Sequence, residues 1–252
     1  MEWHWIGLIV LGSIALVLLT MSIFYNPFFK RICDITCGLA VFVFLWPLYL
    51  VLAILVRTKL GKPILFRQVR PGKDGQLFTL YKFRSMTDEK DENGNLLPDE
   101  VRLTKFGNWL RKTSLDEVPE AINILKGDMS VVGPRPFLVK DMVFFDEETM
   151  KRQKVKPGLT GLAQVNGRNG ISWEDKFKYD LQYCEHITFW GDVGLVLKTI
   201  SKAFAKKENI NREGFATDED YGDYLLRTNK IGEQIYNENM QKSKELISNY
   251  GK

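Results

Sequence analysis

The chain has 252 residues and a net charge of +4, but its charges are unevenly distributed. Residues 1–56 are mostly apolar, whereas the remainder is rich in charged residues, so the length suits a membrane anchor joined to one compact domain. Three cysteines and two histidines are too few for a disulfide framework or a histidine-rich metal site.

The first predicted element is a transmembrane helix within residues 1–29. Residues 5–25 carry no charge, and 21 helical residues would span roughly 31 Å, enough to cross a bilayer core. Tryptophan and tyrosine lie at its two ends, as interfacial aromatic residues do. Lys30 and Arg31 follow it, so the positive-inside rule places its C-terminal end in the cytoplasm.

A second apolar segment, within residues 30–60, is predicted to enter the membrane without crossing it. Basic residues flank this segment on both sides, so both of its ends favour the cytoplasm. Pro47 lies near its middle, where it removes a backbone donor and bends a helix. A re-entrant helix–break–helix with its break at Pro47 would return the chain to the side from which it entered. An ordinary kinked transmembrane helix is the alternative.

The catalytic part, residues 61–214, is predicted to be a mostly helical α+β domain. Strand-like runs at 64–70 and 77–83 flank a turn-forming segment and predict a small β-hairpin. Residues 88–100 are polar and predict a loop. Helices are predicted over residues 104–112, 173–186, 193–207 and 231–248, the last within a polar C-terminal extension, residues 215–252.

Asp116 and Glu117 are the candidate catalytic pair. They follow Ser114, and Ser-x-x-Glu is a capping box, so the sequence predicts a helix that begins with Ser114 as its N-cap. A helix N-terminus favours negative groups, including phosphate. One carboxylate could attack phosphorus while the other holds a divalent cation. A plain capping box explains the same residues without any catalytic function.

Basic residues that could bind a pyrophosphate are spread over separate rigid or glycine- and proline-rich segments. Arginine offers a fixed fork of donors to phosphate oxygens, and Mg²⁺ would share that charge. Solvated surface residues are the alternative for each one taken singly. Walker A and GxGxxG motifs are missing, which disfavours ATP hydrolysis and a dinucleotide cofactor. The candidates are Lys82, Arg84, Arg111, Arg135 and Arg168.

Five motifs together resemble the monotopic bacterial phosphoglycosyl transferases, also called bacterial sugar transferases. They are the basic-apolar-proline segment, LYKFRSM at 80–86, LRKTSLDEVPE at 110–120, GDMSVVGPRP at 127–136 and VKPGLTGLAQVNGR at 155–168. The resemblance runs from about Lys30 to Gly214 and is closest to the short members that initiate glycan assembly. It implies a re-entrant helix over residues 35–56, with Trp46 in place of the usual serine before Pro47.

The resemblance also implies roles for single residues. Asp116 would be the nucleophile, and Glu117, with Asp116, would hold Mg²⁺. Arg135, between two prolines, would lie near the phosphates. Arg111 and Arg168 correspond to other active-site arginines of the family. The remaining residues assigned to binding of the phosphates or the nucleotide sugar are Lys82, Arg84 and Gln164.

The implied reaction is transfer of a sugar phosphate from a UDP-sugar to undecaprenyl phosphate through a phosphosugar on Asp116, with release of UMP. The segment from Gly158 to Trp173 resembles that of members that use N-acetylated amino sugars. The alternatives are a sequential transfer without an adduct and an inactive scaffold of a glycan-assembly complex.

The implied location is the bacterial inner membrane with a cytoplasmic catalytic domain, at the first membrane step of glycoconjugate biosynthesis. Expected partners are the UDP-sugar, polyprenyl phosphate and membrane lipids, without nucleic acid. A homodimer and downstream glycosyltransferases are further candidates.

Overall fold

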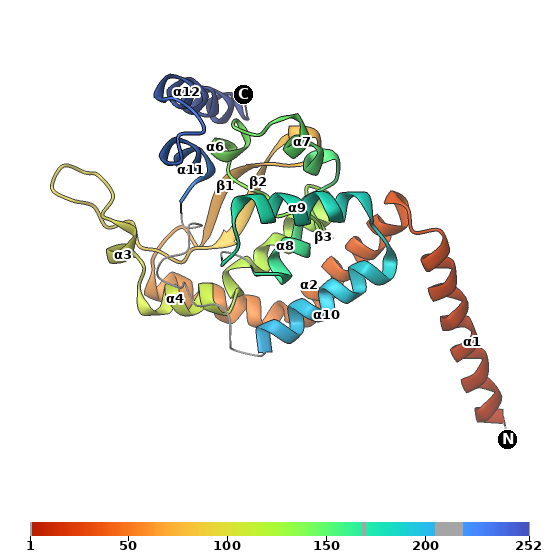
Figure 1. The fold of residues 1–252 in the computed structure, drawn as a ribbon. Helices are drawn as coiled ribbons and strands as arrows, with labels where there is room; N and C mark the ends of the chain where they lie inside the picture. Colours follow the sequence, from red (N-terminus) through yellow and green to blue (C-terminus); the bar gives the residue numbers. More distant parts are fainter. Residues whose placement is uncertain (1, 168–169, 205–218, 252) are drawn as a thin grey trace.

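The computed structural model describes residues 2–167, 170–204 and 219–251. Two long apolar helices begin the chain. α1 (Glu2–Ile23) extends away from the rest of the molecule, and α2 (Pro27–Lys59) runs along the lower side of the catalytic part (Figure 1). Asn26 caps α2 by accepting backbone hydrogen bonds from Phe28 and Phe29. Both helices are long and apolar enough to cross a membrane, as the sequence predicts.

α2 corrects the predicted break at Pro47. The helix is continuous over 33 residues, which corresponds to roughly 50 Å. Proline removes one backbone hydrogen bond from a helix. The halves on either side of it pack on the catalytic part through buried residues that include Gly38 and Leu52, and this packing holds the helical backbone on both sides of the proline.

Two small sheets lie within the catalytic part. β1 (Leu65–Pro71) and β2 (Leu77–Phe83) form the predicted antiparallel hairpin, with a single turn, η1 (Lys73–Gly75), between them. β3 (Ser130–Val132) and β4 (Gly158–Thr160) form a parallel pair that the sequence does not predict. The glycine-rich segment around β4 thus forms a strand and a short helix.

Helices make up most of the rest, in agreement with the predicted mostly helical α+β class. Residues 88–98 form no helix or named strand, and α10 begins four residues before its predicted start. The remaining elements are α3 (Asp99–Arg102), α4 (Lys105–Lys112), η2 (Leu115–Glu120), α5 (Ala121–Lys126), α6 (Val139–Met142), α7 (Glu147–Met150), η3 (Lys151–Lys154), α8 (Leu162–Val165), α9 (Trp173–Glu185), α10 (Phe189–Phe204), α11 (Tyr221–Arg227) and α12 (Glu233–Asn249).

One hydrophobic core joins α2 to the catalytic part. Leu52 and Val56 of α2 pack with Leu60, with Phe83 at the end of β2 and with Leu110 of α4. Burial of such side chains contributes about 1.5–3 kcal/mol each. α2 is therefore an integral layer of the fold, and its position fixes the end of β2 and the start of η2.

The hairpin and α5 are joined by one buried amide. Asn123 of α5 accepts a hydrogen bond from the backbone N–H of Tyr81 (3.1 Å) and donates one to the carbonyl of Thr79 (2.7 Å). Asn123 is fully buried, so both bonds replace contacts with water that the strand would otherwise make. This connection sets β2 beside the residues that precede α5.

Candidate active site

Asp116 and Glu117 lie in η2, between α4 and α5. The predicted capping box is wrong. Ser114 adopts a left-handed conformation (φ 54°), and its side chain makes no capping hydrogen bond. The segment forms a 3₁₀ turn in which Pro119 has no N–H to donate. Glu117 directs its carboxylate to Lys82 instead, with 2.9 Å between Nζ and Oε1.

Lys82 of β2 bridges two carboxylates. Its Nζ also lies 3.2 Å from Oε1 of Glu120. Glu120 is only 4% exposed and is not among the site residues predicted from the sequence. In a 3₁₀ helix, residues three apart lie on one face. The spacing of Glu117 and Glu120, together with Lys82 in the predicted strand, could therefore have identified Glu120.

Both buried carboxyls of η2 hold their protons more tightly than usual. Burial raises the pKa of Glu120 to about 7, against the opposing charge of Lys82, and Glu117 adds to the rise. Burial also raises the pKa of Asp116, again with a contribution from Glu117, while Lys82 and Arg111 oppose it. The cluster holds three acidic groups, Asp116, Glu117 and Glu120, and three cations, Lys82, Arg111 and Arg135, so burial is the main cause of the raised pKa values.

Arg135 reaches this cluster from the loop between β3 and α6. Its Nη1 lies 3.6 Å from Oε1 of Glu117, and its side chain is 45% exposed. The guanidinium is therefore beside the carboxylates and accessible to a ligand. Its backbone is fixed, since its carbonyl accepts a hydrogen bond from Nη2 of Arg152 (2.6 Å) and the carbonyl of Pro136 accepts one from Arg70 (3.0 Å).

The other predicted basic residues differ in their surroundings. Arg111 donates to Oγ of Ser85 (2.9 Å). Its positive charge opposes the rise in the pKa of Asp116, so Arg111 belongs to the cluster. Arg84 is buried and donates to the carbonyls of Met86 and Lys62, so it organises the chain after β2. Its contact with phosphate stays a prediction.

Gln164 is buried in α8, and both polar atoms of its side chain lack a hydrogen-bond partner. An added Cβ at Gly161 would lie 2.6 Å from Oε1 of Gln164 and 2.1 Å from the carbonyl oxygen of Gly133. Gln164 therefore borders the backbone that leads to Arg135. Its role in binding the nucleotide sugar stays a prediction. Arg168 lies outside the described residues.

Comparison with known proteins assigns the family. Residues 25–206 match the family described as bacterial sugar transferase. The chain belongs to this family. This confirms the resemblance found in the sequence. Over 190 residues, this chain is 47% identical to a Bacillus subtilis protein named uncharacterized sugar transferase EpsL. The matched residues cover 75% of this chain and 94% of that protein.

Two relatives carry names that state a reaction. The chain is 41% identical to a UDP-glucose:undecaprenyl-phosphate glucose-1-phosphate transferase of Klebsiella pneumoniae, over 72% of this chain and 41% of that protein. It is 36% identical to an undecaprenyl-phosphate galactose phosphotransferase of Salmonella typhimurium, over 69% of this chain and 40% of that protein. This sugar transferase thus spans about two fifths of each.

The carboxylates of Asp116 and Glu117 in this sugar transferase suit a magnesium ion that would also be bound by substrate phosphates. Within the described ranges, no group of three or more His, Cys, Asp or Glu residues could hold a metal ion. Mg²⁺ does not need such a group, because it binds through one or two carboxylates together with substrate phosphates and water. Asp116 and Glu117 would supply such oxygens, and a bound cation would oppose the repulsion by Glu117 that adds to the effect of burial on the pKa of Asp116.

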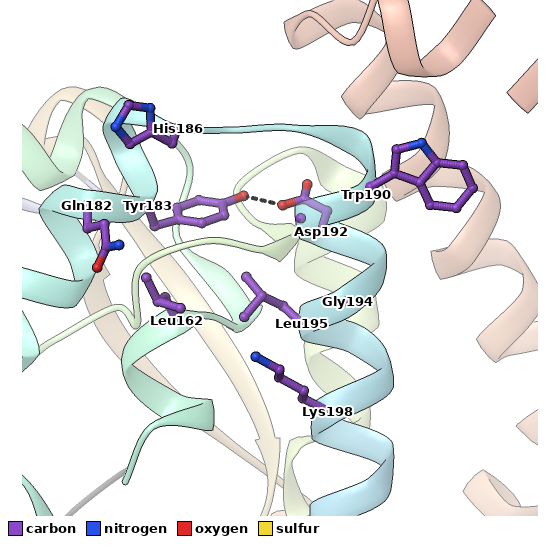
Figure 2. Close-up of a pocket in the computed structure, with 10 residues that line it drawn as sticks. Leu162, Gln182, Tyr183, His186, Trp190, Asp192, Gly194, Leu195 and Lys198 are labelled. Atoms are coloured by element: carbon purple, nitrogen blue, oxygen red, sulfur yellow. Dashed lines mark hydrogen bonds between the residues drawn. The ribbon is translucent and has the colours of Figure 1, made fainter. Parts of the chain in front are cut away.

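A separate cavity of about 360 Å³ lies between α9 and α10 (Figure 2). In it, the hydroxyl of Tyr183 donates to Asp192 (2.9 Å). Asp192 also accepts from Tyr25 and Lys30, so it joins the junction of α1 and α2 to α10. The lining residues come from α8, α9 and α10 and from the loop before α10, and the carboxylates of η2 are not among them. The cavity is thus distinct from the carboxylate cluster of the sugar transferase.

Proposed function

We propose that this chain transfers a sugar phosphate from a UDP-sugar to undecaprenyl phosphate and releases UMP. The observation that carries the proposal is the convergence of Lys82 and Arg135 on Glu117, which directly follows the buried Asp116. A carboxylate nucleophile beside exposed cations suits transfer of a phosphoryl group. The names of the Klebsiella and Salmonella relatives support undecaprenyl phosphate as the acceptor.

The proposed reaction has two displacements at one phosphorus. An oxygen of Asp116 attacks the sugar-bearing phosphorus, the bond from that phosphorus to the bridging oxygen breaks, and UMP leaves with the bonding electrons. An oxygen of undecaprenyl phosphate then attacks the same phosphorus, and the carboxylate of Asp116 leaves. The covalent intermediate divides one difficult transfer into two steps.

The neighbouring residues would lower the barrier by meeting charge on the phosphoryl oxygens. Arg135 is exposed enough to bind them, and its fixed backbone limits the cost of reorganising the site. Lys82 and Arg111 favour the ionised form of Asp116, which is the form that attacks. Mg²⁺ held by Glu117 and Asp116 would supply further neutralisation of the phosphates.

The packing of α2 supports an anchor whose two ends lie on one side of the membrane. Near its start, Asp34 accepts hydrogen bonds from Ser130 and from the N–H of Val131. Towards its end, the hydroxyl of Tyr49 donates to the carbonyl of Val118. Between these contacts, the side chains of residues 43–47 are exposed. Because both halves of α2 pack on the same domain, we propose that both ends lie on the cytoplasmic side and that residues 43–47 enter the bilayer.

Labelling of single cysteines tests this topology. Cysteines are introduced at Lys30 and Lys59 in a chain whose own cysteines have been replaced, and a reagent that does not cross membranes is applied to inverted and right-side-out vesicles. The proposed anchor requires both sites to react from the cytoplasmic face. Reaction from opposite faces would establish a crossing helix.

The sugar is the least constrained part of the proposal. The glycine-rich segment of the sequence favours an N-acetylated amino sugar, whereas the names of the relatives specify glucose and galactose. A panel of UDP-sugars that includes both classes decides between them by the rate of UMP release. Association as a homodimer and with downstream glycosyltransferases stays a prediction.

Release of UMP tests the function itself. Purified full-length chain in nanodiscs with undecaprenyl phosphate and Mg²⁺ should release UMP from at least one UDP-sugar. Asp116→Asn should abolish release, because the amide is a poor nucleophile. Glu148→Gln, which changes an exposed carboxylate of α7, should leave the rate unchanged. Equal rates in Asp116→Asn and the wild type would refute the role of Asp116, whereas no release by the wild type from any sugar would support the scaffold alternative.

A further inference from the structure

One buried carboxylate connects the segment that carries Arg135 to the C-terminal extension. Asp141 of α6 is 3% exposed. Its Oδ2 accepts a hydrogen bond from the backbone N–H of Leu138, three residues after Arg135, and its Oδ1 accepts one from the N–H of Tyr221, both at 3.0 Å. Tyr221 is the first residue of α11, so Asp141 binds α11 and the Arg135 segment together.

The same two segments also share one aromatic cluster. The ring of Phe137, two residues after Arg135, lies 5.1 Å from the ring of Trp173 and 6.0 Å from that of Phe177. The ring of Tyr221 lies 5.1 Å from Trp173 and 5.0 Å from Phe177. Such ring pairs stabilise the packing beyond the burial of their surface. Removal of the Tyr221 ring would therefore loosen the rings that hold Phe137.

α11 is itself firmly docked on α6. Lys140 forms an ion pair with Asp220, within a stretch that the sequence presents as a polar tail. Gly222 lies against Phe144, so closely that an added Cβ would be 2.5 Å from Cε2 of the ring. In Figure 1, α11 and α12 lie beside α6, at the opposite end of the molecule from α1.

The family match ends at residue 206, and α11 lies beyond it. The other groups that hold the Arg135 segment, Arg70 and Arg152, lie within the matched region. α11 is therefore an additional support on a segment that the family region already holds from the other side.

We propose that α11 is a positioning element for Arg135: through Asp141 and the ring cluster it fixes residues 135–138 so that the guanidinium faces Glu117. This inference rests on the proposed function, in which Arg135 binds phosphate oxygens. Tyr221 acts through Arg135 and does not touch the reacting atoms. The C-terminal extension thereby contributes to the rate of the reaction from outside the region that matches the family.

A double-mutant cycle in the full-length chain tests the connection. Tyr221→Ala should lower kcat/KM for UMP release about tenfold, since small displacements of a positioned group have effects of this size or larger. Tyr221→Phe keeps the ring and should restore the rate. In an Arg135→Lys background, which retains charge but loses the fork of donors, Tyr221→Ala should have little further effect, because both changes act on the same interaction. Ile247→Ala on the exposed side of α12 is the matched control.

Hydrogen exchange provides a second readout that needs no activity. In Tyr221→Ala, the amides of Phe137 and Leu138 should exchange faster, whereas those of α5 should not change. Three outcomes would each overturn the inference. Tyr221→Ala could lower the rate by the same factor in both backgrounds, or its loss of rate could match the loss of folded protein measured by thermal unfolding. The exchange of the Leu138 amide could also be unchanged. A wild type that releases no UMP while exchange at Leu138 responds as expected would defeat the proposed function alone.

Discussion

Glu120→Gln should change how the stability of the domain depends on pH. The substitution keeps the shape of the side chain but removes its ionisation. In the wild type, burial raises the pKa of Glu120 from the usual 4.5 to about 7. The folded protein therefore binds a proton at Glu120 more tightly than the unfolded chain does. The stabilisation that results is fully present below pH 4.5 and is lost as the pH rises through 7.

The size of the effect follows from that difference in pKa. Each pH unit corresponds to about 1.36 kcal/mol, so the wild type should lose about 3 kcal/mol relative to Glu120→Gln between pH 4.5 and pH 8. For a domain of this size, 1 kcal/mol shifts Tm by about 2–4 °C. The difference in Tm between the two proteins should therefore change by roughly 6–12 °C across this range.

Thermal unfolding of both proteins in the same detergent, at half-unit pH steps from 4.5 to 8, measures this difference. The buffers contain EDTA, so that no divalent cation competes for the neighbouring Glu117. Parallel Tm profiles for Glu120→Gln and the wild type would refute the reasoning, because they would mean that Glu120 titrates alike in the folded and unfolded states.

Three further predictions concern the anchor, α4 and the metal. Asp34→Ala should lower the free energy of unfolding by about 1–3 kcal/mol, because it leaves Ser130 and an N–H of β3 without their buried acceptor, and Asp34→Asn should lower it less; equal losses in thermal unfolding would contradict this. Gly107→Ala should reduce UMP release at least tenfold, because the added Cβ would lie 1.7 Å from the carbonyl oxygen of Ser85. Gly12→Ala in α1, where the added Cβ would have open space around it, should have no effect. EDTA should abolish UMP release and added Mg²⁺ should restore it; full activity in EDTA would exclude the magnesium role.

Local patterns in the sequence predict many of the elements correctly. The hairpin of β1 and β2, the basic helix α4 and the C-terminal helix α12 each depend on periodicity and turn residues that lie within the element itself. The sequence also places Asp116 and Glu117 at the start of a helical segment after Ser114, but the capping box that it predicts is not formed. The family resemblance then supplies roles that no periodicity could.

Features that depend on distant partners could not be predicted in this way. β3 pairs with β4 across 28 residues, Ser130 with Gly158, and an added Cβ at Gly158 would lie 2.0 Å from the nitrogen of Gly133. The glycines in both motifs thus serve a close approach of two backbones, which neither motif reveals alone. The conformation of Ser114 likewise depends on the proline in η2 and on the attraction of Glu117 to a lysine of β2.

The basic residues illustrate the same limit. Arg84 and Arg135 both lie within motifs of the family, and the sequence assigns both to phosphate binding. In the structure, Arg84 is buried against backbone carbonyls, whereas Arg135 is exposed beside Glu117. This difference arises from the way in which β2 and the loop before α6 pack against η2. The burial of Glu120 depends on the same packing of distant segments.

The central claim is that Asp116 forms a covalent bond to the phosphosugar. Intact-mass spectrometry of the full-length chain mixed with the active UDP-sugar and Mg²⁺, without undecaprenyl phosphate, tests it most directly. The wild type should gain the mass of the sugar phosphate less one water, peptide mapping should place it on Asp116, and added undecaprenyl phosphate should remove it. A chain that turns over normally but never gains this mass would contradict the account and establish a sequential transfer.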